Sequence, residues 1–88
     1  DKARLPLARV YVEKAVSLAP KSSNIRDTAA VIYGALGEVD RELDERLAEV
    51  GLLLEEGQVQ VATLKVERME VEHPDRSQTK QARALLSQ

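Results

Sequence analysis

The residues of this chain best suited to chemistry are one histidine and a set of carboxylates. His73 is the only histidine, and the carboxylates around it are Glu70, Glu72 and Asp75. An imidazole among carboxylates could bind a metal ion or transfer protons. A metal site, however, needs three or four ligands that converge, and these residues lie at the end of an expected helix, where an imidazole interacts favourably with the last carbonyls. We therefore expect a structural role for His73, with no metal site and no cofactor.

Further carboxylates recur at four-residue spacing, as in Asp40 with Asp44 and Glu45 with Glu49. Such pairs act as acid and base only where burial or a cleft separates their pKa values. Their spacing keeps them away from the leucines of the same segment, which we interpret as a solvent-exposed face. The serines have no histidine nearby in the sequence, and the four glycines form no phosphate-binding loop. The sequence predicts that the protein is not an enzyme, and no small-molecule substrate is evident.

Nucleic acid and membrane partners are not expected either. The one short basic face, Arg76, Lys80 and Arg83, has no aromatic stacking partners, and the chain carries a net charge of −2. No window approaches the roughly 18 consecutive apolar residues of a membrane span. We expect a soluble protein, with the cytoplasm as the favoured compartment.

Turn residues divide the chain into five expected helices. Apolar residues recur at three- and four-residue steps between breaks near Pro20, Gly37, Gly57 and Pro74. The expected helices cover about 5–18, 25–36 after a polar turn at 21–24, 38–56, 58–72 and a short last segment capped by Asp75 or Ser77. Short loops make consecutive helices antiparallel. The sequence predicts an all-α fold, an antiparallel array of about five helices in one domain (1–88), which we expect to be a fragment of a longer protein.

Packing is expected to rely on small residues, because the chain has two tyrosines and neither Phe nor Trp. Ala8, Ala15 and Ala62 are predicted to be buried where helices come closest, and Gly51 is predicted to mark a close helix approach. The first helix should bury a stripe, namely Ala8, Tyr11, Val12, Ala15 and Leu18. The last helix, which has few apolar residues, should fray or need a neighbour that this chain lacks.

One spacing occurs twice before a proline. Ala8, Val12 and Ala15 precede Pro20 at the same intervals at which Ala62, Val66 and Met69 precede Pro74. Gly37 follows Pro20 after the length of one helix and its turn, and Tyr33, Ala30 and Ala29 precede this glycine. This pattern resembles the tetratricopeptide repeat (TPR). The match is best over residues 8–37, and it has one irregular step, because Pro20 and Pro74 are separated by more than one repeat and less than two.

The resemblance implies TPR-like α–α hairpins that bind proteins. In this family the ligand lies in a concave groove lined mainly by the first helix of each repeat. Carried onto the matching stretch, the groove positions are Asn24, Asp27, Thr28, Val31, Gly34 and Ala35. The family's clamp for C-terminal carboxylates needs lysines and asparagines, and only Asn24 is of that type. A groove of small residues would instead suit a helix.

The third expected helix is strongly acidic. Residues 38–56 contain eight acids and two arginines, a net charge of −6. This helix is either a solvated face with basic neighbours or an acidic groove for a basic peptide. Glu55 and Glu56 lie at the helix end where the dipole disfavours them. We expect Lys65 or Arg68 to compensate them, unless they face a partner.

Two functions remain open from the sequence. The chain is either a non-enzymatic protein–protein interaction module, an adaptor or scaffold that presents a groove for a peptide or helix, or a structural assembly or dimerisation element without a ligand of its own. In the second case the apolar stripe of the third helix (Leu43, Leu47, Val50 and Leu54) would be a dimer seam. The expected partner is a protein or peptide, or a second copy of the chain.

Overall fold

The chain breaks into helices at the predicted turn residues. The computed structural model describes the backbone of residues 5–88 and the side chains of residues 7–88, so the first four residues of the expected domain lie outside the described part. The helices are α1 (Leu5–Leu18), α2 (Ser23–Ala35), α3 (Val39–Glu55), α4 (Val59–Glu72) and α5 (Ser77–Leu86). Residues 5–88 contain no strand, which confirms the predicted all-α fold.

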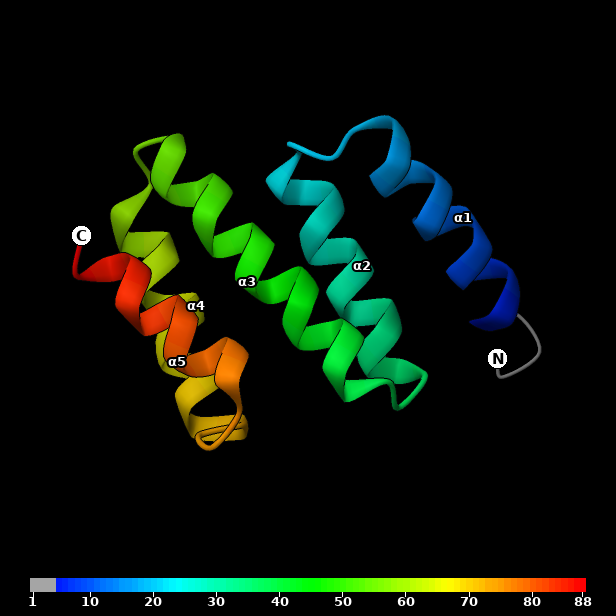
Figure 1. The fold of residues 1–88 in the computed structure, drawn as a ribbon. Coiled ribbons are helices and arrows are strands. Elements are labelled where there is room, and N and C mark those ends of the chain that lie inside the picture. The colour runs from blue at the N-terminus through cyan, green and yellow to red at the C-terminus, as the bar shows by residue number, and fades with distance from the viewer. Residues whose placement is uncertain (1–4) are drawn as a thin grey trace.

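Consecutive helices run in opposite directions and form an array (Figure 1). Helix α1 packs on α2, α2 packs on α3, and α3 contacts both α4 and α5, which also contact each other. Backbone contact between α2 and α4 is absent among the described residues. Helix α3 is therefore central, and α1 and the α4–α5 pair form the two ends of the array.

The described core consists of two apolar clusters. The smaller one joins α1 and α2 through Val12, Ala29 and Tyr33. The larger one joins the other three helices, and its buried members are Leu43, Val50, Leu53, Ala62, Val66, Met69 and Ala82. Ala82 lies on α5, which packs on α3 and α4, so the expectation that this short helix lacks a neighbour in the chain is wrong.

The predicted small-residue contacts are correct for α4 but not for α1. Ala62 is fully buried, whereas Ala8 and Ala15 are only half-buried. Tyr11 and Leu18 were expected in the packed stripe, yet 73% and 76% of their surface is exposed. The reason is that, among the described helices, α1 packs against α2 alone.

The close approach between helices occurs at a different glycine from the predicted one. Nothing lies within 4 Å of a Cβ built on Gly51, so the prediction for this residue is wrong. A Cβ on Gly34 would instead lie 3.1 Å from the carboxylate of Glu42. The absence of a side chain at Gly34 therefore lets α3 place this carboxylate against α2.

Glycine ends both α2 and α3 with the same capping motif. Gly37 and Gly57 have φ values of +78° and +79°. The next residue in each turn, Glu38 or Gln58, donates its amide to a carbonyl five residues back. This is a Schellman cap, which requires the left-handed conformation that glycine adopts without strain.

The turn between α4 and α5 is held by a buried threonine. Thr79 donates its hydroxyl to the carbonyl of His73 at 2.7 Å, and 2% of Thr79 is exposed. Arg76 occupies the N-cap position of α5 without a side-chain cap bond, so the expected cap at Asp75 or Ser77 is wrong. Thr79 thus fixes the backbone at the end of α4 from inside the next helix.

Alanine substitution should separate the capping glycines from the glycine inside a helix. Gly37→Ala and Gly57→Ala are each expected to lower the free energy of unfolding by about 1–2 kcal/mol, because alanine is strained at positive φ. Gly51→Ala is the matched control, expected to raise it by about 0.5–1 kcal/mol, since alanine is favoured inside a helix. Thermal unfolding followed by circular dichroism measures all three. Equal melting temperatures would contradict this account of the caps.

Candidate functional site

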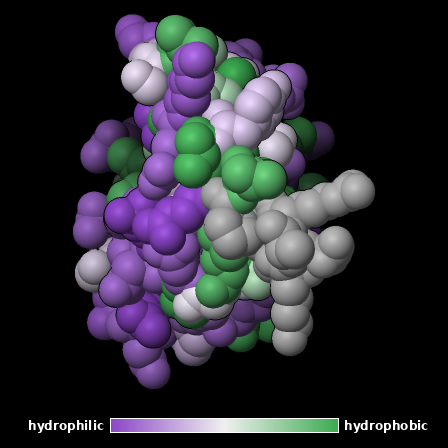
Figure 2. All heavy atoms as spheres, turned by 90° about the vertical axis from the view of Figure 1, so that its right-hand side faces the viewer, coloured by the Kyte–Doolittle hydropathy of each residue, from purple (hydrophilic) through white to green (hydrophobic). Residues whose placement is uncertain are grey.

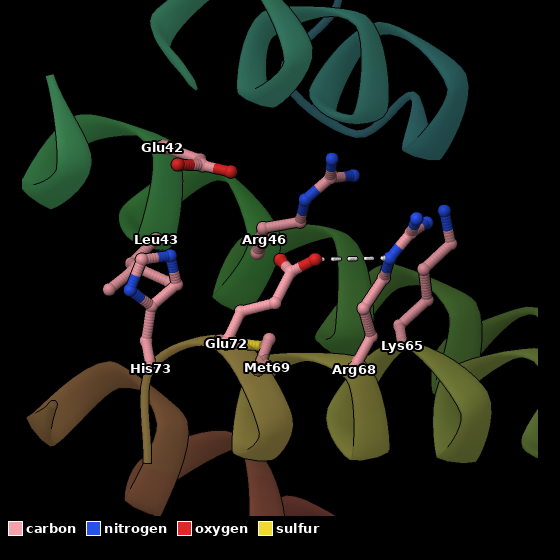
Figure 3. Close-up of a pocket in the computed structure, with 8 residues that line it drawn as sticks. All are labelled: Glu42, Leu43, Arg46, Lys65, Arg68, Met69, Glu72 and His73. Atoms are coloured by element: carbon pink, nitrogen blue, oxygen red, sulfur yellow. Dashed lines mark ion pairs between the residues drawn. The ribbon is translucent and has the colours of Figure 1, made fainter. Parts of the chain in front are cut away.

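The enclosed space nearest the predicted groove lies between α3 and α4, on the side that faces α2. Its lining residues are Glu42, Leu43, Arg46, Lys65, Arg68, Met69, Glu72 and His73 (Figure 3). The cavity measures about 10 Å³, which is room for one water molecule at most. Ligand pockets for small molecules are clefts or cavities of roughly 300–1,000 Å³ that bury most of the ligand's surface. Four further hollows of the described surface, about 260–490 Å³ in volume, are open to solvent.

Four charged side chains beside this cavity connect three helices, and we call them the ion quartet: Asp27, Arg46, Glu49 and Lys65. Lys65 of α4 places its Nζ 3.2 Å from Asp27 of α2 and 3.3 Å from Glu49 of α3. Arg46 pairs with the same two carboxylates and lies 3.3 Å from Glu49. Each charge in the quartet thus contacts two opposite charges. These ion pairs link α2 to α4 although their backbones do not touch.

The two carboxylates of the quartet respond differently to their surroundings. Burial raises the pKa of Glu49, and the charge of Lys65 opposes this rise without cancelling it. Partial burial also disfavours ionised Asp27, but hydrogen bonds from Arg46 and Lys65 outweigh it and hold the pKa of Asp27 below its ordinary value. Only 3% of Glu49 is exposed, so its charge depends on these two cations.

The prediction that Glu49 lies on a solvent-exposed face is wrong. Glu49 stands three residues after Arg46 and four before the buried Leu53, so it shares the helix face that α4 covers. Its spacing of four residues from Leu53 was the signal that could have identified this face. The four-residue spacing from Glu45 was given more weight, although Glu45 pairs with a different helix.

The acidity of α3 is balanced by bases on neighbouring segments. Glu45 accepts two hydrogen bonds from Arg26 of α2, at 3.0 and 3.2 Å. Asp40 pairs with Arg76 at 2.9 Å. Cationic side chains also line the cavity beside α3. The structure therefore favours a helix with basic neighbours over an acidic groove for a basic peptide.

The two acids at the end of α3 are not compensated as predicted. Glu55 and Glu56 are both exposed, and Glu56 accepts hydrogen bonds from the side chains of Ser23 and Gln58. Lys65 belongs to the ion quartet, while Arg68 pairs with Glu72 at 3.5 Å. The expectation that Lys65 or Arg68 neutralises this pair is wrong, and a partner-facing role for the pair stays a prediction.

His73 lies close to one carboxylate that flanks it in the sequence, Glu72, and to one from another helix, Glu42. Its ring nitrogen and the carboxylates of Glu42 and Glu72 lie within 4.8 Å of one another. Such a group could in principle hold a cation. The same cavity is lined by two arginines and a lysine, however, and one of them, Arg68, already pairs with Glu72 (dashed line in Figure 3). This positive surrounding opposes a bound cation, so we propose no metal site here.

The predicted groove residues share one face of α2. Four of them are exposed: Asn24, Thr28, Val31 and Ala35. The other two, Asp27 and Gly34, are half-buried at the edge of this face next to α3. Asp27 belongs to the ion quartet, and Gly34 lies against the side chain of Glu42. The face therefore borders the cavity, and its polar edge is held in place by ion pairs.

Comparison with models of known protein families, with curated proteins and with solved structures finds no match for this chain. None of the helices between residues 5 and 88 has the length and apolar character needed to cross a bilayer. The function proposed below therefore rests on the geometry of the chain itself.

Proposed function

We propose that this chain is a non-enzymatic protein–protein interaction module built of stacked helical hairpins similar to tetratricopeptide repeats. The spacing of the helices supports the proposal. Alternate helices begin at similar intervals: α2 at Ser23 and α4 at Val59, and α3 at Val39 and α5 at Ser77. Both intervals are close to a repeat length of about 34 residues, whereas the separation of Pro20 and Pro74 is not. In this register α2 and α4 are first helices, and α1, α3 and α5 are second helices. The support therefore comes from the helix spacing and not from the intervals before Pro20 and Pro74, which would equate α1 with α4.

The observation that carries the proposal is the uncovered face of α2. Val31, in the middle of this face, exposes 56% of its surface, and Ala35 beside it adds little bulk. Small residues around an apolar side chain let a second helix or a peptide approach closely. Asn24 and Thr28 supply polar groups at the other end of the face. We propose a peptide or helical segment of a partner protein as its ligand.

The cavity gives no support to an enzymatic role. Its volume of about 10 Å³ excludes a substrate. The buried carboxylate beside it, Glu49, pairs with Arg46 and Lys65, so it already has the partners that a substrate would have to displace. The ion pairs around Glu49 are typical of a polar contact between packed helices.

A peptide selection tests the proposed groove. A phage-displayed library of random peptides is expected to yield binders whose affinity falls at least tenfold when Val31 is replaced by Arg, because the charge blocks the apolar centre of the face. Val59→Arg is the matched control, since Val59 is a valine on another helix with a similar exposed fraction, 57%. Binders equally sensitive to both substitutions, or to neither, would argue against a groove on α2.

One form of the assembly alternative is excluded by burial. The apolar stripe of α3 cannot be a dimer seam, because Leu43 and Val50 are buried inside the chain. A different observation favours assembly, namely that apolar residues on α1 and α4 remain uncovered.

A further inference from the structure

The outer face of α1 is apolar and lacks a neighbour among the described residues. Leu7, Val10, Tyr11 and Leu18 expose between 64% and 76% of their surface. They lie within one side of the helix, because positions 7, 11, 14 and 18 are successive turns. Figure 2 looks onto this end of the array and shows hydrophobic residues beside the grey N-terminal residues. Lys14 is the charged residue within this face, which we call the α1 face.

Helix α4 carries a similar face at the opposite end of the array. Leu64 and Val71 are 66% and 82% exposed, and Val61 beside them is 39% exposed. Glu67, also exposed, lies between Leu64 and Val71 on the same side of the helix, and the exposed Gln60 lies one turn before Leu64. We call these five residues the α4 face. The nearby helix α5 offers no such surface, since its outer residues include Lys80, Gln81 and Arg83.

The two faces match in spacing and in charge. The α1 face follows positions 7, 11, 14 and 18, and the α4 face follows positions 60, 64, 67 and 71, with the same steps of four, three and four. The order of these steps is the same when a helix is read from either end. In a parallel contact Lys14 therefore lies opposite Glu67, and in an antiparallel contact the two residues lie one helical turn apart. Among the described side chains, neither Lys14 nor Glu67 has an ion-pair partner.

We propose that the α1 face of one copy docks on the α4 face of a second copy, with Lys14 of one chain paired to Glu67 of the other. The faces lie at opposite ends of the array, so one molecule cannot bring its own pair together. The contact is heterologous, so an assembly of any length keeps one free α1 face at one end and one free α4 face at the other. The contact is independent of the groove on α2, and Val31→Arg is expected to leave it unchanged.

The size of the faces sets the strength of the contact. Each helix has 14 residues, which is about 21 Å of helix. A pair of such helices buries less than the roughly 800 Å² per partner of a standard interface, so we expect association at concentrations on the order of 100 µM. Added salt weakens it, because Lys14 and Glu67 lie at the surface.

Charge reversal tests the pairing. In sedimentation velocity at low salt, Lys14→Glu and Glu67→Lys are each expected to weaken self-association about threefold to tenfold, because like charges then face each other. The double variant restores the opposite charges and is expected to recover the wild-type affinity. A mixture of the two single variants should also associate. A double variant as weak as the single ones would overturn the pairing.

Blocking one face at a time tests the head-to-tail geometry. Tyr11→Asp and Leu64→Asp are exposed substitutions, and circular dichroism verifies that both variants fold. Each alone is expected to stay monomeric, whereas their mixture should form a one-to-one dimer and nothing larger, since one intact α1 face meets one intact α4 face. A wild-type chain that stays monomeric up to millimolar concentration, or a dimer that persists when Tyr11→Asp and Leu64→Asp are each tested alone, would overturn the proposal.

Discussion

Lys65→Met is expected to lower the free energy of unfolding by about 2 kcal/mol at neutral pH, because it breaks a buried ion pair. The substitution keeps the length of the side chain but leaves Glu49 buried with Arg46 as its remaining cationic partner. Breaking a buried ion pair costs about 3–5 kcal/mol, and we expect a smaller loss because Lys65 is itself 26% exposed. Urea unfolding measures the loss, and Lys80→Met, at an exposed site on α5, is the matched control.

The loss should become smaller on acidification. Burial already raises the pKa of Glu49 above its ordinary value of 4.5, and removal of Lys65 raises this pKa further. A carboxyl whose pKa is raised by folding favours the folded state below that pKa and loses this contribution as the pH rises through it. The deficit of Lys65→Met should therefore decrease between pH 7 and pH 5. In the wild-type chain the pKa of Asp27 is lowered below its ordinary value of 3.8, and Lys65 is one of the two groups that lower it, so the loss of Lys65 also raises the pKa of Asp27.

A second substitution separates the buried charge from the packing of the lysine side chain. Glu49→Gln in the Lys65→Met background is expected to recover about half of the lost stability, because a neutral amide costs less to bury than an unpaired carboxylate. If the loss is the same at pH 5 and pH 7 and the double variant recovers nothing, the charge of Glu49 has no part in the effect.

Leu43→Ala is expected to have the largest effect of any single truncation in the chain, a loss of about 2–5 kcal/mol. Leu43 is 1% exposed and is the largest fully buried side chain among residues 7–88. It belongs to the cluster that joins α3 to α4 and α5, so the cavity left by its truncation opens between three helices. A small domain has limited stability to lose, and this variant should show a lower midpoint in urea.

Leu64→Ala is the matched control for Leu43→Ala. Leu64 is 66% exposed, and a surface truncation of this kind changes stability by within about 0.5 kcal/mol. Both variants are compared at protein concentrations well below those of self-association. Similar midpoints for the two variants would show that the large cluster is not the main source of stability.

The breaks between helices could be predicted from sequence because they depend on local chemistry. Gly37 and Gly57 end helices through their own backbone conformation, which does not depend on distant contacts. The exposure of Tyr11 and Leu18 could not be predicted in this way. Periodicity shows which residues share a helix face, but a second helix must be present before that face is buried.

The same limit applies to the candidate site. The common face of Asn24, Thr28 and Val31 follows from helix geometry alone, and the structure places these residues together. The ion quartet could not be predicted from helix geometry, because Glu49 pairs with Lys65, which lies on another helix. The crossing angles between the helices determine which basic side chains pair with the acids of α3. These angles cannot be derived from a single sequence.

The division of the core into two clusters has a consequence for cooperativity. Helices α1 and α2 share one apolar cluster, α3, α4 and α5 share the other, and ion pairs such as Arg26–Glu45 cross the boundary between them. Added salt strengthens apolar contacts or leaves them unchanged, whereas it weakens ion pairs. Because α2 also packs closely on α3, we expect the α1–α2 hairpin and the remaining helices to unfold together, more tightly at low ionic strength than at high ionic strength, where the ion pairs across the boundary weaken. A protein that assembles through α1 would then couple its assembly to the local stability of this hairpin.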